Sequence, residues 1–143
     1  MRIEIELPEV WHFETELAVR ISDVNFGGHL AHDSVLSLVH EARARFFQAH
    51  GWSELKIEGC GIIMADAALV YKAEAFFSDR LLIQLTARDF TTKGCDLVYL
   101  LTGVGSKTEI ARAKTGIVFF DYERREPVEI PDGFRRIFLD GAD

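Results

Sequence analysis

Residues 33–50 read DSVLSLVHEARARFFQAH, and this stretch decides the fold of the chain. Its apolar residues recur at i, i+3, i+4 and i+7, the spacing that gathers side chains on one face of a helix. That face comprises Val35, Leu38, Val39, Ala42, Phe46 and Ala49. Asp33 is a candidate N-cap, and Gly51 is a candidate for the residue just beyond the C-terminus. We therefore predict one long helix with a buried apolar face.

The rest of the chain reads as strands. One strand is predicted before the helix, at 13–21. Four follow it, each alternating in polarity or rich in β-branched and aromatic residues: 62–76, 80–91, 96–104 and 110–121. The turns between these four are short, which favours antiparallel hairpins over parallel crossovers. The tail, 127–143, is predicted to be a surface segment with a short turn near 134–138.

This order of elements predicts an α+β fold. A helix with so apolar a face cannot lie exposed, and the simplest way to cover it is an antiparallel sheet wrapped around it. Residues 1–143 are expected to form a single domain. The sheet would leave unpaired edges, which a dimer joining two sheets edge to edge would satisfy.

Composition excludes several classes of partner. The formal charge is −7, from 16 Lys and Arg against 23 Asp and Glu, without a basic cluster, so we expect no nucleic-acid binding. No apolar run is long enough to span a bilayer, and the N-terminus does not resemble a signal peptide. We expect no membrane association and a cytoplasmic location. Cys60 and Cys95 form no CxxC motif, so both are expected to be buried, reduced thiols in strands.

A polar loop leads directly into the helix. Residues 23–33, DVNFGGHLAHD, combine two acids, an amide, two histidines and a pair of glycines. The start of a helix presents unpaired backbone N–H groups and the positive end of the helix dipole. Such a position can stabilise negative charge that develops on an oxygen atom. The sequence therefore places the candidate site at this loop.

Each loop residue has a structural and a functional interpretation. Asp23 is expected to accept backbone N–H bonds, as in an Asx-turn. Asn25 is either a turn residue or a group that orients substrate or water. His29 either forms a hydrogen bond with the loop backbone or orients water or the thioester. Gly28, in the glycine pair, forms a tight turn, lets a ligand approach the backbone, or does both. His32 is expected to contribute its backbone N–H rather than its ring.

Two carboxylates near the helix are candidate general bases. Asp33 is either the N-cap or a base. Glu41 is either a solvated residue paired with Arg45 at i, i+4 or a base that activates water. His29 and His32 lack a third ligand at useful spacing, so no metal site is expected.

Several motifs together resemble the hotdog-fold acyl-CoA thioesterases, in the branch of the 4-hydroxybenzoyl-CoA thioesterases. The loop is similar to the D-x-D/N…G-x-H pattern of that family, and 40–43, HEAR, to its E-x-A-R segment. Residues 70–75, VYKAEA, followed by 78–81, SDRL, resemble its Y-x-x-P-A…G-D-x-L signature. Residues 111–118, ARAKTGIV, resemble its last long strand. The resemblance extends from Phe13 to Pro131.

The resemblance implies hydrolysis of an acyl-CoA or related thioester to a free acid and a thiol. The carbonyl would dock at the helix N-terminus near His32, with Asn25 and His29 positioning water or substrate. In one branch a catalytic aspartate occupies the position of Asn25; in another, an acid in mid-helix, close to Glu41, acts across the dimer interface. The base would thus be Glu41 first and Asp33 second.

The substrate-binding set implied here is Gly28, His32 and Asp23. Coenzyme A would enter only as part of the substrate, with no other cofactor, and the protein would be a homodimer or a dimer of dimers. Four residues are candidates to contact the CoA phosphates: Arg43, Lys72, Arg112 and Lys114. Two alternatives stay open: a hotdog enoyl-thioester hydratase or dehydratase, and a non-catalytic module that binds acyl-thioesters.

Overall fold

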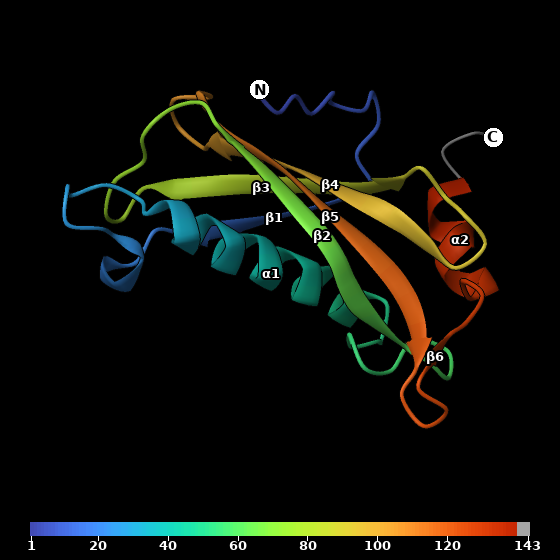
Figure 1. Ribbon diagram of the computed structural model, residues 1–143. Coiled ribbons are helices and arrows are strands. Elements are labelled where there is room, and N and C mark those ends of the chain that lie inside the picture. Colours follow the sequence, from blue (N-terminus) through green and yellow to red (C-terminus); the bar gives the residue numbers. More distant parts are fainter. Residues whose placement is uncertain (140–143) are drawn as a thin grey trace.

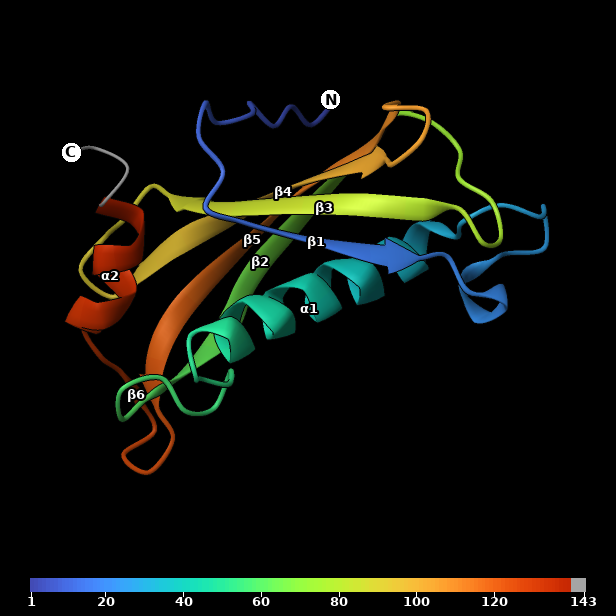
Figure 2. The ribbon, with the colours of Figure 1, turned by 180° about the vertical axis from the view of Figure 1, so that it is seen from behind.

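The computed structural model describes residues 1–139 of the chain. Its strands and helices are β1 (Phe13–Ala18), a 3-10 turn (Ile21–Asp23), α1 (His32–Ala49), β2 (Gly61–Tyr71), β3 (Arg80–Arg88), β4 (Gly94–Gly103), β5 (Glu109–Asp121), β6 (Glu126–Pro127) and α2 (Asp132–Leu139). Within these residues the strands form one antiparallel sheet in the order β1-β3-β4-β5-β2, and β6 pairs with the end of β5. Figures 1 and 2 show this sheet curving around α1. The predicted α+β arrangement is confirmed.

Helix α1 buries the predicted apolar face, with small adjustments. Val39, Ala42 and Phe46 are fully buried, while Ala49 is exposed and Phe47 takes its place in the core. Fully burying one such large apolar side chain stabilises the fold by about 1.5–3 kcal/mol. Gly51 follows the helix with φ of +79°, the left-handed conformation expected just past a helix end.

The predicted N-cap of α1 is wrong. Ala31 holds that position, with extended backbone and no side-chain cap, and Asp33 lies inside the first turn. A carboxylate there still interacts favourably with the positive end of the helix dipole. The first backbone N–H groups of α1 are therefore left without a side-chain cap.

The central strands supply the other half of the core. Alternate residues of a strand point to opposite faces of the sheet, and the fully buried ones on β3, β4 and β5 include Ile83, Leu85, Leu97, Tyr99, Leu101, Ala111, Ala113 and Phe119. Strand β2 ends at Tyr71 rather than at residue 76, because both Lys72 and Ala73 donate their backbone N–H to the Ile110 carbonyl. This pairing turns the chain out of the sheet and towards the loop that precedes α1.

The prediction for the C-terminal tail is also wrong. Residues 132–139 form α2, which packs into the core instead of lying on the surface as a short turn. Phe134 is fully buried, with its ring centroid 4.9 Å from that of Phe119 and 5.0 Å from that of Phe138. Phe134 and Phe138 share one helix face at i, i+4, so the tail covers the open end of the core. The last residues of the predicted segment, 140–143, lie outside the described part.

Strand β2 forms one outer edge of the sheet. Its middle residues, 63–67, are exposed on both faces, and Ile63 and Met64 keep 36% and 43% of their surface in contact with solvent. Both cysteines are free thiols. Cys95 is buried, which raises the pKa of its thiol to about 12, whereas Cys60 is only half-buried and precedes β2. No helix in residues 1–139 is long and apolar enough to cross a membrane.

Candidate active site

The polar loop before α1 is a tight reversal of the chain. Val24 and Leu30 form an isolated antiparallel bridge. Inside it, the Gly28 N–H donates to the Asn25 carbonyl at 3.0 Å, and the Asn25 N–H donates to the His29 carbonyl at 2.9 Å. Gly28 has φ of +87°, a conformation that favours glycine. The loop is thus fixed by its own backbone.

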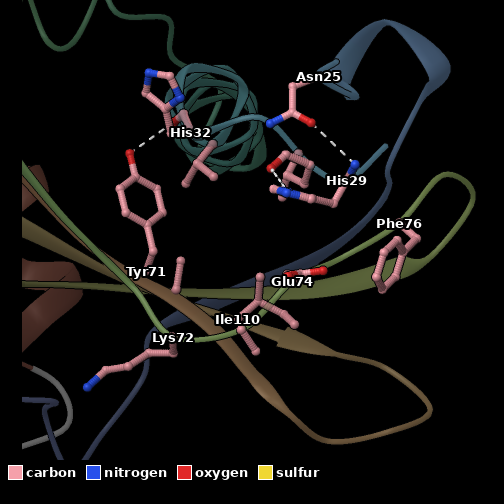
Figure 3. Close-up of a pocket in the computed structure, with 12 residues that line it drawn as sticks. Asn25, His29, His32, Tyr71, Lys72, Glu74, Phe76 and Ile110 are labelled. Carbon is pink, nitrogen blue, oxygen red and sulfur yellow. Dashed lines mark hydrogen bonds between the residues drawn. The ribbon is translucent and has the colours of Figure 1, made fainter. Parts of the chain in front are cut away.

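The amide of Asn25 is oriented by the same loop. Its Oδ1 accepts hydrogen bonds from the backbone N–H of Gly27 at 3.0 Å and of His29 at 3.4 Å. Because the oxygen is occupied in this way, the Nδ2 group is the part of the amide that can donate to a ligand. Figure 3 shows Nδ2 turned towards the start of α1.

His29 presents one free nitrogen. Its Nδ1 lies 3.4 Å from the Leu30 carbonyl oxygen. A carbonyl can only accept, so Nδ1 carries the hydrogen in this contact, and the neutral ring keeps a lone pair on Nε2. The Nε2 atom can therefore orient a water molecule by accepting its hydrogen bond, or it can accept a proton.

The start of α1 supplies backbone donors. Within residues 1–139, the N–H groups of His32 and Asp33 have no hydrogen-bond acceptor, as is usual for the first turn of a helix. The Tyr71 hydroxyl donates to the His32 carbonyl at 3.1 Å and ties β2 to this turn. Burial, and then the nearby Asp33 carboxylate, raises the pKa of Tyr71.

These groups surround one cavity of about 670 Å³. Its walls come from the loop, the start of α1, the end of β2 with the residues that follow it, and the start of β5 (Figure 3). Three predicted site residues, Asn25, His29 and His32, meet here. Gly28 does not line the cavity but forms the turn that holds Asn25 and His29 in place.

The three predicted acids lie elsewhere: Asp23, Asp33 and Glu41 do not line this cavity. The buried Asp23 accepts the Arg20 backbone N–H at 2.8 Å and so closes the 3-10 turn. Burial alone would raise the pKa of Asp23, but the hydrogen bonds and charge of Arg20 outweigh it, and the net pKa is lowered.

Glu41 is held on the flank of α1 that faces β1. Its Oε2 lies 2.6 Å from the Arg45 guanidinium, and Arg45 also donates to the Thr15 hydroxyl and the Glu16 carbonyl of β1. This is the i, i+4 pair expected from the sequence for a solvated glutamate.

Glu74 is a cavity residue that the sequence interpretation missed. It is the one Asp or Glu among the described residues that line the cavity. The only available signal was its place inside the VYKAEA motif, which was interpreted for its likeness to the family and not for its acid. Tyr71, in the same motif, lines the cavity as well.

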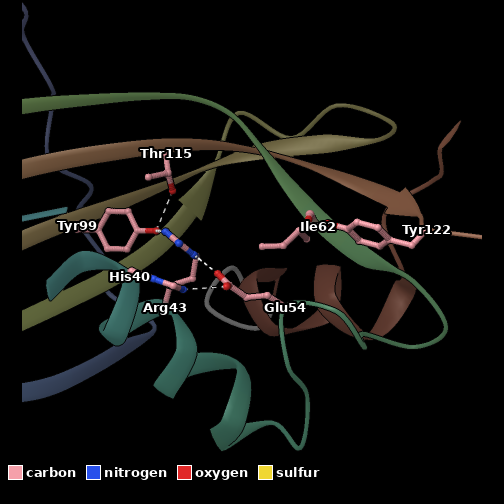
Figure 4. Close-up of polar contacts among 7 residues, drawn as sticks. All are labelled: His40, Arg43, Glu54, Ile62, Tyr99, Thr115 and Tyr122. Carbon is pink, nitrogen blue, oxygen red and sulfur yellow. Dashed lines mark hydrogen bonds and ion pairs between the residues drawn. The ribbon is translucent and has the colours of Figure 1, made fainter. Parts of the chain in front are cut away.

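A buried polar network lies deeper along α1 (Figure 4). The side chain of Arg43 is only 7% exposed; it pairs with Glu54 and donates to the Tyr99 hydroxyl at 3.3 Å. His40 lies 3.1 Å from the other Glu54 oxygen, and Tyr99 shares a hydrogen bond of 2.8 Å with Thr115. Arg43 is thus held inside the protein by Glu54 and Tyr99.

Of the other cations considered for CoA phosphates, two are also engaged. Arg112 pairs with Glu109, and Lys114 lies 2.7 Å from an Asp66 oxygen. Lys72 lines the cavity and has no ion-pair partner in the described chain. Over the same residues, no three His, Cys, Asp or Glu side chains gather closely enough to hold a metal ion.

A model of the thioesterase-like superfamily matches residues 19–138, which include the loop, α1 and the whole sheet from β2 onwards. The chain belongs to the thioesterase-like superfamily. A search of curated protein sequences gives no significant match.

Solved structures place this superfamily member among hotdog folds. Slr0204, a 1,4-dihydroxy-2-naphthoyl-CoA thioesterase from Synechocystis, has a TM-score of 0.81 at 22% identity, covering 92% of this chain and 98% of that one. The BH1999 gentisyl-coenzyme A thioesterase has a TM-score of 0.75 at 20% identity, covering 86% and 99%. SAV2348 from Staphylococcus aureus, solved in complex with CoA, has a TM-score of 0.80 at 16% identity, covering 96% and 87%. At these identities the similarity concerns the fold.

Proposed function

We propose that this superfamily member hydrolyses an acyl-CoA thioester to a free acid and a thiol. The observation that carries the proposal is that His32, whose backbone N–H is unpaired within the described chain, lines the same cavity as Asn25 and His29. Membership of the thioesterase-like superfamily and the thioesterases among its structural neighbours support it. The CoA complex of the Staphylococcus aureus protein supports CoA as the carrier.

In the proposed reaction the thioester carbonyl accepts a hydrogen bond from the His32 N–H group. This donor, together with the helix dipole, stabilises the oxyanion that forms when water adds to the carbonyl carbon. The Asn25 Nδ2 group orients substrate or water, and His29 Nε2 lies where it can relay a proton. A cavity of about 670 Å³ is within the usual range for small-molecule sites. Lys72 is the candidate contact for the phosphates.

Glu41 and Asp33 stay predictions as general bases. Replacing either carboxylate by its amide, Glu41→Gln or Asp33→Asn, removes the ability to accept a proton at nearly constant volume. A loss of about 10²-fold or more in kcat for one variant would identify it as the base. Wild-type turnover in both variants would exclude both.

The proposed function is tested with a panel of aromatic, short-chain and long-chain acyl-CoAs and a thiol reagent. Release of free CoA that depends on the enzyme supports the proposal. A change in enoyl absorbance without thiol release would instead identify a hydratase or dehydratase. Tight binding of CoA esters without turnover of any of them would identify a non-catalytic module.

We infer that the protein forms a homodimer through β2. This edge strand is exposed on both faces in its middle, and an unpaired edge is a template for a second strand. Pairing β2 with its own copy gives a two-fold symmetric interface. Light scattering gives the mass of the assembly and separates a dimer from a dimer of dimers. The variant Met64→Lys places a charge on this edge, and we expect it to shift the equilibrium from dimer towards monomer.

A further inference from the structure

The proposed hydrolysis needs a group that removes a proton from water, and Asn25 cannot supply it. A carboxamide does not accept a proton at neutral pH, and the Asn25 oxygen already receives two backbone N–H bonds. Two other residues that line the cavity can accept a proton, His29 through Nε2 and Glu74 through its carboxylate. Glu74 is the only carboxylate among the described residues that line it.

The backbone holds Glu74 firmly in this wall. Before it, the N–H groups of Lys72 and Ala73 donate to the Ile110 carbonyl at 2.8 and 3.2 Å. After it, the Ala75 carbonyl accepts the Leu30 N–H at 2.7 Å, and the Ala75 side chain is 1% exposed. The segment is thus anchored on both sides, and Glu74, next to the buried Ala75, lines the cavity.

Figure 3 shows Glu74 on the wall opposite Asn25 and the start of α1, with its carboxylate towards the side that His29 lines. The side chain is exposed and forms no ion pair or side-chain hydrogen bond within residues 1–139. In contrast, Glu41 and Asp23 are each occupied by an arginine. Glu74 is therefore available to a molecule in the cavity.

We propose that Glu74 is the general base of this site, an assignment that rests on the proposed thioester hydrolysis. The Glu74 carboxylate takes one proton from water as the water oxygen bonds to the carbonyl carbon. The carbonyl electron pair moves to the oxygen, which the His32 N–H group holds. The intermediate then collapses, the C–S bond breaks, and the thiolate sulfur takes up the proton from Glu74. One thioester and one water give one acid and one thiol.

The start of α1 and the segment that holds Glu74 have different roles in the proposed reaction. Donors on the helix side stabilise negative charge on oxygen, and an acceptor on the opposite side faces the nucleophile. A thioester is planar, so binding its carbonyl oxygen at α1 leaves the carbonyl carbon open to water that approaches its face from the Glu74 side. General-base help of this kind contributes about 10²–10⁴-fold in rate.

The test compares Glu74→Gln with Glu14→Gln, using the best substrate of the acyl-CoA panel. Glu14 is an exposed residue of β1 without a charged partner in the described chain, so its variant makes the same change in net charge away from the cavity. We expect Glu74→Gln to lose about 10²-fold or more in kcat with little change in KM. Glu14→Gln should keep wild-type turnover, and both should melt at the wild-type temperature.

A second measurement separates a base from a merely structural residue. Hydroxylamine attacks a thioester as a neutral amine, without prior removal of a proton, and releases the same thiol. Glu74→Gln should therefore recover most of its thiol release when hydroxylamine replaces water as the nucleophile. An equal loss with water and with hydroxylamine would overturn the assignment, as would wild-type hydrolysis.

The outcomes also separate the two proposals. A wild-type enzyme that releases thiol while Glu74→Gln releases it equally fast overturns the role of Glu74 and leaves thioester hydrolysis intact. A wild-type protein that releases no thiol from any member of the panel overturns both.

Discussion

The backbone donor at the start of α1 can be removed by one substitution, His32→Pro. Proline has no N–H and is well tolerated as the first residue of a helix, the position that His32 holds. The preceding residue, Ala31, has φ of −73° and ψ of 146°, in the extended region that a residue before proline prefers. The exposed His32 side chain and its unpaired N–H mean that no packing and no hydrogen bond of the described chain is lost.

The magnitude follows from what the substitution removes. Loss of one donor to an oxyanion costs about 10²–10³-fold in kcat, or about 2.7–4 kcal/mol. The positive end of the α1 dipole remains, so we expect the lower end, about 10²-fold. The free energy of unfolding should not fall, and it should rise by about 0.4–1 kcal/mol because proline restricts the unfolded chain.

The assay is steady-state thiol release, with His32→Ala as the matched control. His32→Ala also removes the imidazole but keeps the backbone N–H, so it reports any contribution of the ring. We expect His32→Ala to stay within a few-fold of the wild type and His32→Pro to fall well below it. Equal kcat for the two variants, with both folded, would refute the role of this N–H.

Three further predictions concern stability. Glu54→Gln leaves the buried guanidinium of Arg43 without its carboxylate, and urea unfolding should show a loss of about 2–3 kcal/mol, reduced by the partial exposure of Glu54. Gly28→Ala places a side chain at φ of +87° and should cost about 1–2 kcal/mol in thermal unfolding, whereas Gly105→Ala, at a glycine with ordinary φ and open space around it, should cost less. Because the folded pKa of Asp23 is lowered, its ionised form adds stability that is complete above the ordinary pKa of about 3.9 and lost as the pH falls through the folded pKa. Melting curves from neutral to acidic pH should therefore fall less steeply for Asp23→Asn than for the wild type.

The elements that the sequence predicted well are those defined by local periodicity. The apolar face of α1 repeats over several turns, and each strand from β3 to β5 carries its own alternation, so the helix, these strands and the hairpins β3–β4 and β4–β5 were correct. The hairpin expected between β2 and β3 was wrong, because β3 pairs with β1 and β2 pairs with β5. The wrapped sheet followed because a helix with such a face has to be covered.

The errors occur where tertiary contacts override local signals. The first strand after the helix was expected to end at residue 76. It ends at Tyr71 instead, because the Ile110 carbonyl accepts hydrogen bonds from the next two N–H groups, those of Lys72 and Ala73. Phe134 and Phe138 carry a helical spacing too short to be recognised alone, and only the open end of the core makes α2 stable. Asp33 resembled an N-cap, yet the helix starts one residue earlier, at His32.

The same distinction explains which parts of the site could be predicted. Asn25, His29 and His32 are arranged by a turn and a helix start, which are local features and visible in eleven consecutive residues. The position of Glu74 depends instead on a hydrogen bond between Leu30 and Ala75, far apart in sequence. The spacing of apolar residues along the sequence cannot predict such a long-range contact.

The two glutamates show why the base could not be chosen from the sequence. Glu41 lies on α1, the element that the sequence predicts best, and the i, i+4 spacing already predicted its pair with Arg45. What fixes that pair on the flank of α1 is the contact of Arg45 with β1, which only the fold reveals. Glu74 lies in an irregular segment with no cation within ion-pair distance in the described chain, so its charge is not neutralised locally. A carboxylate that the fold leaves unpaired beside a cavity is free to accept a proton, and this physical difference favours Glu74 over Glu41.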